Sequence, residues 1–296
     1  MIDLHCHTTV SDGGDSPSEL VAVAAAAGLD AIAVTDHDND AGCTEGARAG
    51  RQHGLEVVRG VEISCDVEDL GERGYGPRAR PTMHLLGYFI PEASNPLSQA
   101  LADLQYHRAN RNRLIVDRLN ELGIPVTFEE VETEAGGPGS QIGRPHFAAV
   151  LVRHGAVSEY QQAFDEYLAK GARAYIGRKL YKPVEAIELM VSAGVVPVLA
   201  HPFTLNLEPA ELERFTDELV EAGLKGIEAY HGDWTEPEQE PLKAIAERRG
   251  LVVSGGSDYH GDMRPDRALP GGKTGIVAPE RALEDLRAAA GDLQRT

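Results

Sequence analysis

Short apolar runs alternate with amphipathic stretches along the first ninety residues of the chain. Apolar runs of this length predict buried strands, and the stretches between them have the spacing of helices. The sequence Ser16-Pro17-Ser18-Glu19 predicts a helix start, because it combines a capping serine, an early proline and a glutamate three residues on. We therefore expect strands at 2–5, 31–35, 56–64 and 83–90, helices at 16–28 and 44–53, and a loop at 66–81.

The pattern changes between residues 98 and 180, which predict mostly helix and no convincing strand–helix unit. Alternation then resumes, with helices expected at 183–194, 208–223, 237–250 and 279–290, and strands at 195–200, 226–230, 251–254 and 274–277. Repeated strand–helix units imply a parallel sheet or a barrel. We expect an α/β domain made of residues 1–97 and 181–296, and a mostly helical inserted subdomain at 98–180 that binds substrate.

Composition limits the possible partners of the chain. Its 296 residues suffice for a barrel-type domain with an insertion. The net charge of −19 argues against extended electrostatic binding of duplex DNA. It is compatible with a nucleotide or a short single-stranded RNA bound by local arginines. No apolar run approaches the length of a membrane helix, and the three cysteines are too scattered for a disulfide framework. We expect a cytoplasmic protein with no signal peptide and no membrane partner.

Two histidines near the start of the chain, His5 and His7, predict half of a metal site. Side chains alternate along a strand, so both imidazoles point to the same side. Cys6 between them points away and is expected in the core. Considered alone, the pair is as compatible with a surface or core pair as with a metal site.

Further histidines and carboxylates recur at the ends of the predicted strands. In barrels of strand–helix units, the active-site residues lie at the C-terminal ends of the strands. Histidines placed by chance would not prefer these positions. Imidazole and carboxylate ligands without thiolate favour Mn, Fe or Zn. The candidate metal ligands are His5, His7, Asp12, His37, Glu62, His84, His201, Asp258 and His260.

Three of these positions allow another interpretation. His84 lies within an apolar strand, where a single buried histidine is usually structural. Asp12 precedes Gly13 and is also compatible with a simple turn. Asp36 neighbours His37 but faces the opposite side of its strand, so we expect it to support a ligand rather than to bind metal.

These motifs resemble the PHP (polymerase and histidinol phosphatase) domain family over the whole chain. The motifs that carry the resemblance are Asp3-Leu4-His5-Cys6-His7, Ser11-Asp12-Gly13, Thr35-Asp36-His37, Gly60-Val61-Glu62, His84, Ala200-His201-Pro202 and Ser257-Asp258-Tyr259-His260. The resemblance implies a distorted seven-stranded (β/α) barrel with a centre of two or three divalent metal ions.

The resemblance also implies how the ligands are divided among the metals. One metal would be held by His5, His7, Glu62 and Asp258. A second would share Glu62 and be held by His84 and His201, and a third would be held by Asp12, His37 and His260. Such a centre is typical of phosphoester hydrolysis by metal-bound hydroxide attack at phosphorus. His201, His260 and Asp258 are the catalytic candidates, although metal ligands are poor free acids or bases.

Arginines in the insertion predict the substrate class. The apolar stripe Ile115, Leu119 and Leu122 extends backward by helical steps to Arg111 and Arg108. The sequence Gly143-Arg144-Pro145-His146 predicts a Gly-rich turn that adds Arg144 and His146. Guanidinium groups match phosphate oxygens, so we expect phosphate binding here. The alternative is salt bridging to nearby acids, namely Asp103, Asp117 and Glu121.

A barrel with this insertion resembles the nucleoside 3′,5′-bisphosphate phosphatase and 5′–3′ exoribonuclease group of the family. The resemblance implies hydrolysis of the 3′ phosphate of adenosine 3′,5′-bisphosphate, or cleavage of short RNA from its 5′ end. His231 is a further candidate for substrate binding. Possible walls for the base are Tyr106, Phe147, Tyr160, Tyr230, His231 and Trp234. The alternatives are a histidinol phosphatase, which the arginines disfavour, and a non-catalytic PHP module.

Overall fold

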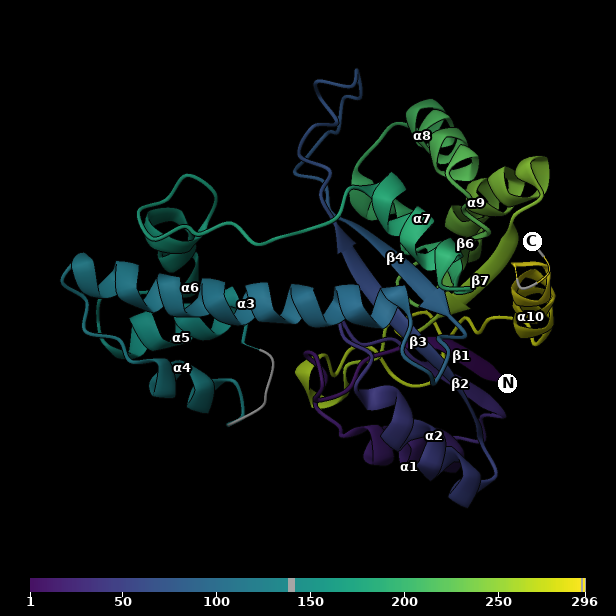
Figure 1. Ribbon diagram of the computed structural model, residues 1–296, viewed down its shortest axis with the longest axis horizontal. Coiled ribbons are helices and arrows are strands. Elements are labelled where there is room, and N and C mark those ends of the chain that lie inside the picture. The colour runs from purple at the N-terminus through teal and green to yellow at the C-terminus, as the bar shows by residue number, and fades with distance from the viewer. Residues whose placement is uncertain (138–141, 294, 296) are drawn as a thin grey trace. The chain divides into compact units, whose positions relative to one another are not determined.

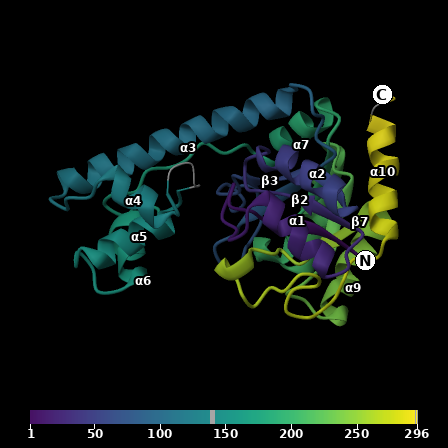
Figure 2. The ribbon, with the colours of Figure 1, turned by 90° about the horizontal axis from the view of Figure 1, so that it is seen from below.

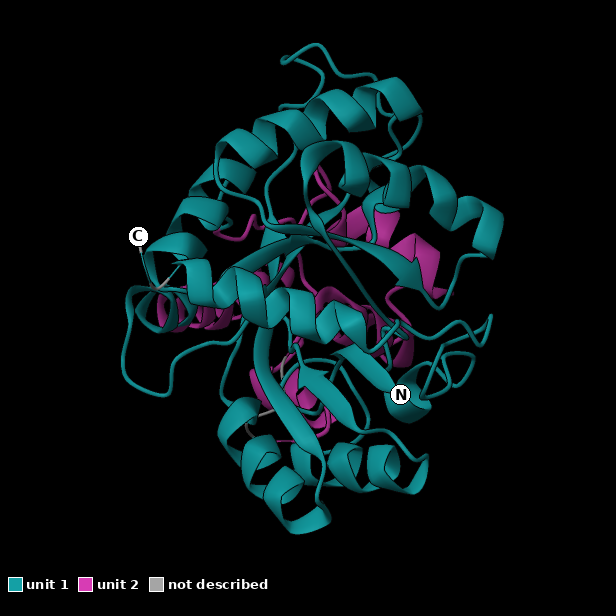
Figure 3. Ribbon diagram, turned by 90° about the vertical axis from the view of Figure 1, so that its right-hand side faces the viewer, with its two compact units in different colours: residues 1–101, 180–296 teal, residues 102–179 magenta. Residues whose placement is uncertain are grey.

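The computed structural model describes residues 1–137, 142–293 and 295. The chain forms two compact units, of which unit 1 contains residues 1–101 and 180–296 and unit 2 contains residues 102–179 (Figure 3). Within the described residues, the structure contains no helix that is long and apolar enough to cross a membrane.

Unit 1 is built on a seven-stranded sheet whose strands are neighbours in chain order (Figure 1). The strands are β1 (Ile2–Cys6), β2 (Ala31–Val34), β3 (Glu56–Cys65), β4 (Met83–Tyr88), β5 (Val196–Leu199), β6 (Gly226–His231) and β7 (Val252–Gly256). The segment after β7 returns to β1, where the His7 N–H donates to the Tyr259 carbonyl at 2.9 Å. The sheet is therefore a nearly closed barrel, as predicted.

Two details of the expected sheet are wrong. Residues 274–277 form no strand, and the following residue, Ala278, pairs with Ile2 of β1 through an isolated bridge. The sheet is also not parallel throughout, because β4 runs antiparallel to both β3 and β5. The first residues of β4 consequently lie beside the last residues of β3, with His84 opposite Ser64. This direction brings His84 to the edge where the parallel strands end.

Helices cover the strands of unit 1. They are α1 (Pro17–Ala26), α2 (Gly42–His53), α7 (Pro183–Ser192), α8 (Pro209–Glu221), α9 (Glu236–Arg249), α10 (Arg281–Leu293) and the start of α3 (Pro96–Glu121). The views show α1 and α2 over β2 and β3, and α10 beside β7 (Figures 1 and 2). The predicted capping box is confirmed, since Ser16 Oγ accepts from the Glu19 N–H and Glu19 Oε2 accepts from the Ser16 N–H.

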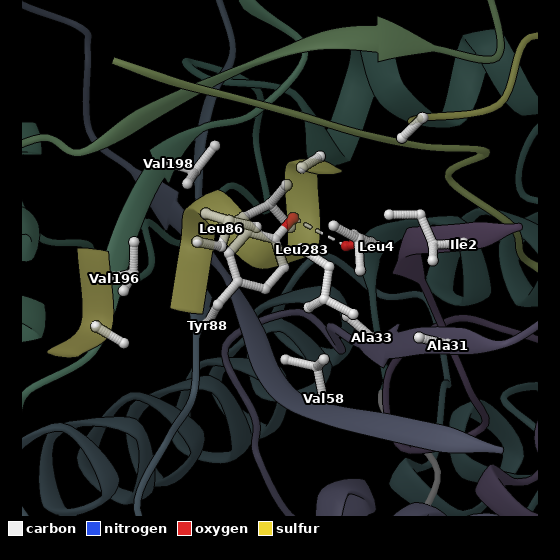
Figure 4. Close-up of a cluster of buried hydrophobic side chains, with 14 of the residues drawn as sticks. Ile2, Leu4, Ala31, Ala33, Val58, Leu86, Tyr88, Val196, Val198 and Leu283 are labelled. Atoms are coloured by element: carbon white, nitrogen blue, oxygen red, sulfur yellow. Dashed lines mark hydrogen bonds between the residues drawn. The ribbon is translucent and has the colours of Figure 1, made fainter. Parts of the chain in front are cut away.

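Two of the apolar clusters in the core of unit 1 lie against β1. In one cluster, Cys6 packs with residues of α1 and β2, which confirms its predicted core position. In the other, Leu283 of α10 packs with Leu4 and Tyr88 (Figure 4). The Tyr88 hydroxyl donates to the Leu4 carbonyl at 2.9 Å and lies 3.1 Å from Ser254 Oγ. One fully buried side chain thus connects β1, β4 and β7.

Unit 2 contains the rest of α3, with α4 (Phe128–Glu134), α5 (Arg144–Arg153), α6 (Tyr160–Ala163) and a π-helical turn at Phe164–Leu168. Its core includes Ile115, Leu119 and Phe147. The expected Gly-rich turn around Arg144 is wrong, because Arg144 is the first residue of α5. Gly143 caps the helix, and its N–H donates to His146 Nδ1 at 3.0 Å.

Replacing Tyr88 by phenylalanine is predicted to lower the free energy of unfolding by about 1–3 kcal/mol, because it removes the buried hydroxyl that both Leu4 and Ser254 contact. Urea unfolding followed by circular dichroism measures the change. The control is Tyr160→Phe, whose residue is 50% exposed and should change stability by less than about 0.5 kcal/mol. Equal stability of the two variants would contradict a structural role for the Tyr88 hydroxyl.

Candidate metal centre

One edge of the barrel gathers all the candidate metal ligands. Each lies in a strand or in the segment that directly follows one. Because β4 is antiparallel, it contributes His84 from its beginning rather than from its end. Their ligand atoms form overlapping groups in which all atoms lie within 4.8 Å of one another. The groups contain every candidate ligand, and one of them joins His5 to Glu228 and His231; the candidate ligands are His5, His7, Asp12, His37, Glu62, His84, His201, Asp258 and His260. Because the groups overlap, the expected division among three metals stays a prediction.

Glu62 lies at the middle of this cluster and is 1% exposed. Its Oε2 lies 3.3 Å from His5 Nε2, 3.2 Å from His7 Nε2 and 3.1 Å from His37 Nδ1. Its Oε1 lies 2.8 Å from His84 Nδ1 and 2.7 Å from His201 Nε2. Burial alone would raise the pKa of Glu62, but the surrounding histidines hold that pKa well below its usual range. Both carboxylate oxygens therefore face ring nitrogens.

The atoms that converge on Glu62 are suited to a cation. His5 Nε2, His7 Nε2, His37 Nδ1 and Glu62 Oε2 are buried, and none has a hydrogen-bond partner among the described residues. Buried polar atoms left without partners are costly, and a carboxylate oxygen surrounded by ring nitrogens is a donor set that divalent metals favour. The residues present thus fit the metal centre that the sequence predicts.

Asp12 is the most solvent-accessible of the candidate ligands, with its side chain 46% exposed. Its Oδ1 lies 3.4 Å from His260 Nε2, and its Oδ2 lies 3.8 Å from His37 Nε2. His260 in turn places Nδ1 2.8 Å from the Asp258 carbonyl, so Nδ1 carries the proton and Nε2 faces Asp12 with its lone pair. Asp12 therefore faces the histidines, although it lies in a loop.

Glu228, which was not singled out from the sequence, orients two of the histidines through hydrogen bonds. It is fully buried, its Oε1 lies 2.9 Å from His5 Nδ1, and its Oε2 accepts the His201 N–H at 2.7 Å. Burial lowers the pKa of His5, but Glu228 and Glu62 outweigh burial and raise the pKa to about 10. A metal ion that binds His5 must therefore displace a proton. The available signal was a carboxylate inside the apolar strand Gly226–His231.

Asp36 supports the loop that carries two of the candidate ligands. Its carboxylate accepts the Thr8 N–H at 2.8 Å, the Thr8 hydroxyl at 2.8 Å and the Ser11 hydroxyl at 2.6 Å. Burial raises its pKa, while these donors lower it. Ser11 Oγ also lies 3.4 Å from His7 Nδ1, so the position of Asp36 is that of the supporting residue expected from the sequence.

The cluster borders a pocket of about 200 Å³, which is lined by His231 and Trp234 as well as by candidate ligands. His231 Nδ1 accepts the Asp233 N–H at 3.1 Å, so the neutral ring carries its proton on Nε2. Burial lowers the pKa of His231 to about 4, which keeps the ring neutral at pH 7. Nε2 has no hydrogen-bond partner among the described residues and lies 3.9 Å from Asp258 Oδ2. His231 is thus a hydrogen-bond donor beside the cluster.

Of the aromatic residues expected to pack against the base of the substrate, some line the pocket and others do not. Trp234 lines the pocket, and its ring stacks on His231 at 4.6 Å and meets Phe203 at 4.7 Å. Phe147 is wrong as a wall, because it is fully buried in the core of unit 2. Tyr230 packs under the Lys243 ammonium at 4.5 Å and does not line the pocket. Tyr106 and Tyr160, at 65% and 50% exposed, lie on the surface of unit 2.

A second cluster, of arginines, lies within unit 2. Arg111 is 5% exposed, and its only hydrogen-bond acceptor in the described part of the chain is Asn112 Oδ1. Burial, with the charges of Arg108, Arg144 and Arg178, lowers the pKa of Arg111 to about 9. Arg178 was not singled out from the sequence.

Two of the three acids expected to pair with these arginines have other partners. Asp103 pairs with Lys179, and Glu121 pairs with Arg118 at 2.7 Å. Arg144 donates to the Ile176 carbonyl at 3.2 Å and lies over the Tyr175 ring, while its Nε is buried without a partner among the described residues. The guanidinium of Arg111 is buried beside other arginines and has no carboxylate partner among the described residues. Such a position favours a bound anion.

Comparison with known proteins identifies the family. The model of the PHP domain family matches residues 3–181. The chain belongs to the PHP domain family. A solved structure from Bifidobacterium adolescentis, assigned as a metal-dependent phosphoesterase, shares 30% identity with a TM-score of 0.76 and aligns over 97% of this chain and 96% of that one.

Three relatives of this PHP protein have similar lengths and different names. A 5′-3′ exoribonuclease of Haemophilus influenzae is 32% identical over 87% of this chain and 89% of its own. A 3′,5′-nucleoside bisphosphate phosphatase of Chromobacterium violaceum is 32% identical over 88% of this chain and 87% of its own. A phosphoribosyl 1,2-cyclic phosphate 1,2-diphosphodiesterase of Eggerthella lenta is 32% identical over 88% of this chain and 94% of its own.

Replacing Glu228 by glutamine is predicted to weaken metal binding about 10- to 100-fold. The NH2 group of the glutamine would face either His5 Nδ1 or the His201 N–H, so one of the two present hydrogen bonds would be lost. Metal content after dialysis against a chelator measures the effect. Glu45→Gln is the matched control, because Glu45 also accepts one backbone N–H and one side chain but lies away from the histidines. Wild-type metal retention in Glu228→Gln would contradict the orienting role.

Proposed function

We propose that the chain is a metal-dependent phosphoesterase that hydrolyses the 3′ phosphate of nucleoside 3′,5′-bisphosphates, with short 5′-phosphorylated RNA as a related substrate. The observation that carries the proposal is the convergence of unpartnered ring nitrogens on the buried carboxylate of Glu62. The names of the relatives in Haemophilus influenzae and Chromobacterium violaceum support this choice of substrate.

The metal ions of this proposal are two or three of Mn, Fe or Zn. The residues that would hold them are His5, His7, Asp12, His37, Glu62, His84, His201, Asp258 and His260. Such ions polarise phosphate oxygens and activate water for in-line displacement. Glu228 and Asp36 keep the ligands in place before substrate arrives, which reduces the reorganisation needed during the reaction.

The neutral ring of His231 would bind the phosphate that is hydrolysed. Its tautomer is set by the Asp233 N–H, which leaves Nε2–H free to donate to a phosphate oxygen. Stacking on Trp234 limits rotation of the ring, so the donor direction is held by two independent contacts. His201, His260 and Asp258 contribute as ligands, and no side-chain nucleophile is needed.

The arginine cluster of unit 2 is a separate candidate site for a phosphate group of the substrate. Arg111 supplies the strongest argument, because a guanidinium that is 5% exposed and surrounded by other arginines is stabilised by a bound anion. Arg108 and Arg144 belong to the same proposal, with His146 in the first turn of α5. Arg178 extends the cluster by one residue beyond those expected from the sequence.

A second candidate function is hydrolysis of a cyclic phosphate, which the 32% identity to the Eggerthella lenta diphosphodiesterase favours. Histidinol phosphatase activity is less consistent with the site, because a cationic substrate gains nothing from the buried Arg111. The exclusion of duplex DNA and the cytoplasmic location stay predictions from net charge and cysteine content.

The metal-loaded protein is predicted to release phosphate from adenosine 3′,5′-bisphosphate, with chelation abolishing turnover and Mn²⁺ restoring it. The comparison panel contains short 5′-phosphorylated RNA, phosphoribosyl 1,2-cyclic phosphate and histidinol phosphate. Turnover of the cyclic compound or of histidinol phosphate, without turnover of the bisphosphate or the RNA, would overturn the proposal. The substrate that is turned over then decides between the alternatives.

Arg111→Met is predicted to raise KM for the bisphosphate by at least about tenfold, because it removes a charged hydrogen-bonding group of the kind worth about 1.5–3 kcal/mol. Metal content should not change, since the hydrogen bonds that Arg111 donates among the described residues go to Asn112. Arg113→Met on the exposed face of the same helix is the control and should leave KM at the wild-type value. Loss of metal from Arg111→Met would show that the residue acts on the centre instead.

A further inference from the structure

Asp258 and His201 are the two candidate ligands with a positive φ, and Asp258 has the larger value. Its φ is +52°, in the left-handed region that non-glycine residues rarely adopt. Such a conformation persists only where surrounding contacts hold it, and it is common at functional sites. The contacts that hold Asp258 are therefore informative about the site.

The two carboxylate oxygens of Asp258 face different partners. Oδ1 faces the histidines, at 3.2 Å from His7 Nε2 and 3.6 Å from His5 Nε2. Oδ2 is paired with the guanidinium of Arg267. The same guanidinium lies 3.4 Å from the Asp258 carbonyl, so it contacts both the backbone and the side chain of this residue.

Arg267 is itself held in place from the other side. It is 8% exposed, and its second terminal nitrogen donates to Asp233 Oδ2 at 2.6 Å. Asp233 also pairs with Lys273 at 3.3 Å. A buried arginine between two carboxylates has a fixed direction, because its planar group matches both acceptors. Losing it would leave Asp258 Oδ2 free to rotate toward the histidines or to remain buried without a partner.

We propose that Arg267 is a positioning residue that occupies Asp258 Oδ2, so that Asp258 offers only Oδ1 to the metal centre. The Asp233 side chain acts through Arg267 by fixing the direction of the guanidinium. This inference rests on the proposed metal centre, but it does not depend on which phosphate ester is the substrate.

The test uses full-length Arg267→Met, which keeps the length of the side chain and removes its charge and donors. Arg267→Lys restores the charge, and Asp233→Asn weakens the support of Arg267. Arg249→Met is the matched control, because Arg249 also bridges two carboxylates, Asp217 and Glu213, between helices of the same unit. Each variant is titrated with Mn²⁺, and the visible spectrum of its Co²⁺-loaded form is recorded.

The expected result is a loss of Mn²⁺ affinity of about 10- to 100-fold in Arg267→Met, with a changed Co²⁺ spectrum. Arg267→Lys should recover part of the affinity, Asp233→Asn should show a smaller loss, and Arg249→Met should match the wild type. If Arg267→Met does not fold in a thermal melt, Arg267→Lys and Asp233→Asn carry the test alone.

Wild-type affinity and spectrum in a folded Arg267→Met would overturn the inference, as would tighter metal binding. Where Arg267→Met does not fold, a wild-type affinity and spectrum in both remaining variants would overturn it. These readouts separate it from the proposed function. A protein that binds metal as expected but turns over no phosphate ester would contradict the function and leave the role of Arg267 standing.

Discussion

The interaction on which the rest of the structure depends is the meeting of ring nitrogens with the buried carboxylate of Glu62. A charged carboxylate that is 1% exposed is expensive unless cations surround it. Without a metal, a proton on His5 contributes such a charge, as the raised pKa of His5 indicates. A metal ion that binds His5 must displace that proton. Folding of this edge of the barrel, protonation and metal binding are therefore linked equilibria.

The direction of one strand explains how a barrel can bring so many ligands to a single edge. In a parallel sheet only the strand ends and the segments after them reach this edge. Since β4 is antiparallel, its beginning reaches the edge, and His84 lies opposite Ser64 near the end of β3. Because side chains alternate along β4, Met83 and Leu85 on either side of His84 are buried in the core. An apolar strand can thus carry one ligand without exposing its other residues.

The candidate ligands could be predicted from the sequence because each stands in a short motif at the edge of a predicted strand. Asp36 was predicted as a supporting residue because it stands in one of these motifs, but two other residues that act on the ligands could not be predicted in this way. Glu228 is found only once β6 is known to lie beside His5, and Arg267 lies in a loop whose path depends on the closed barrel. Arg144 was misplaced for a local reason, since proline and glycine predict turns as readily as they predict helix starts.

The charged side chains that line the pocket affect how a phosphate can bind there. The pocket is lined by the carboxylates of Asp12, Glu62, Asp233 and Asp258, and by the arginines Arg264 and Arg267 among the described residues. The charge of Arg267 is already balanced by Asp233 and Asp258. A phosphate dianion would therefore meet a net negative surface before metal is bound. Metal ions held at this edge would offset that negative charge, so binding of metal would favour binding of a phosphate beside it.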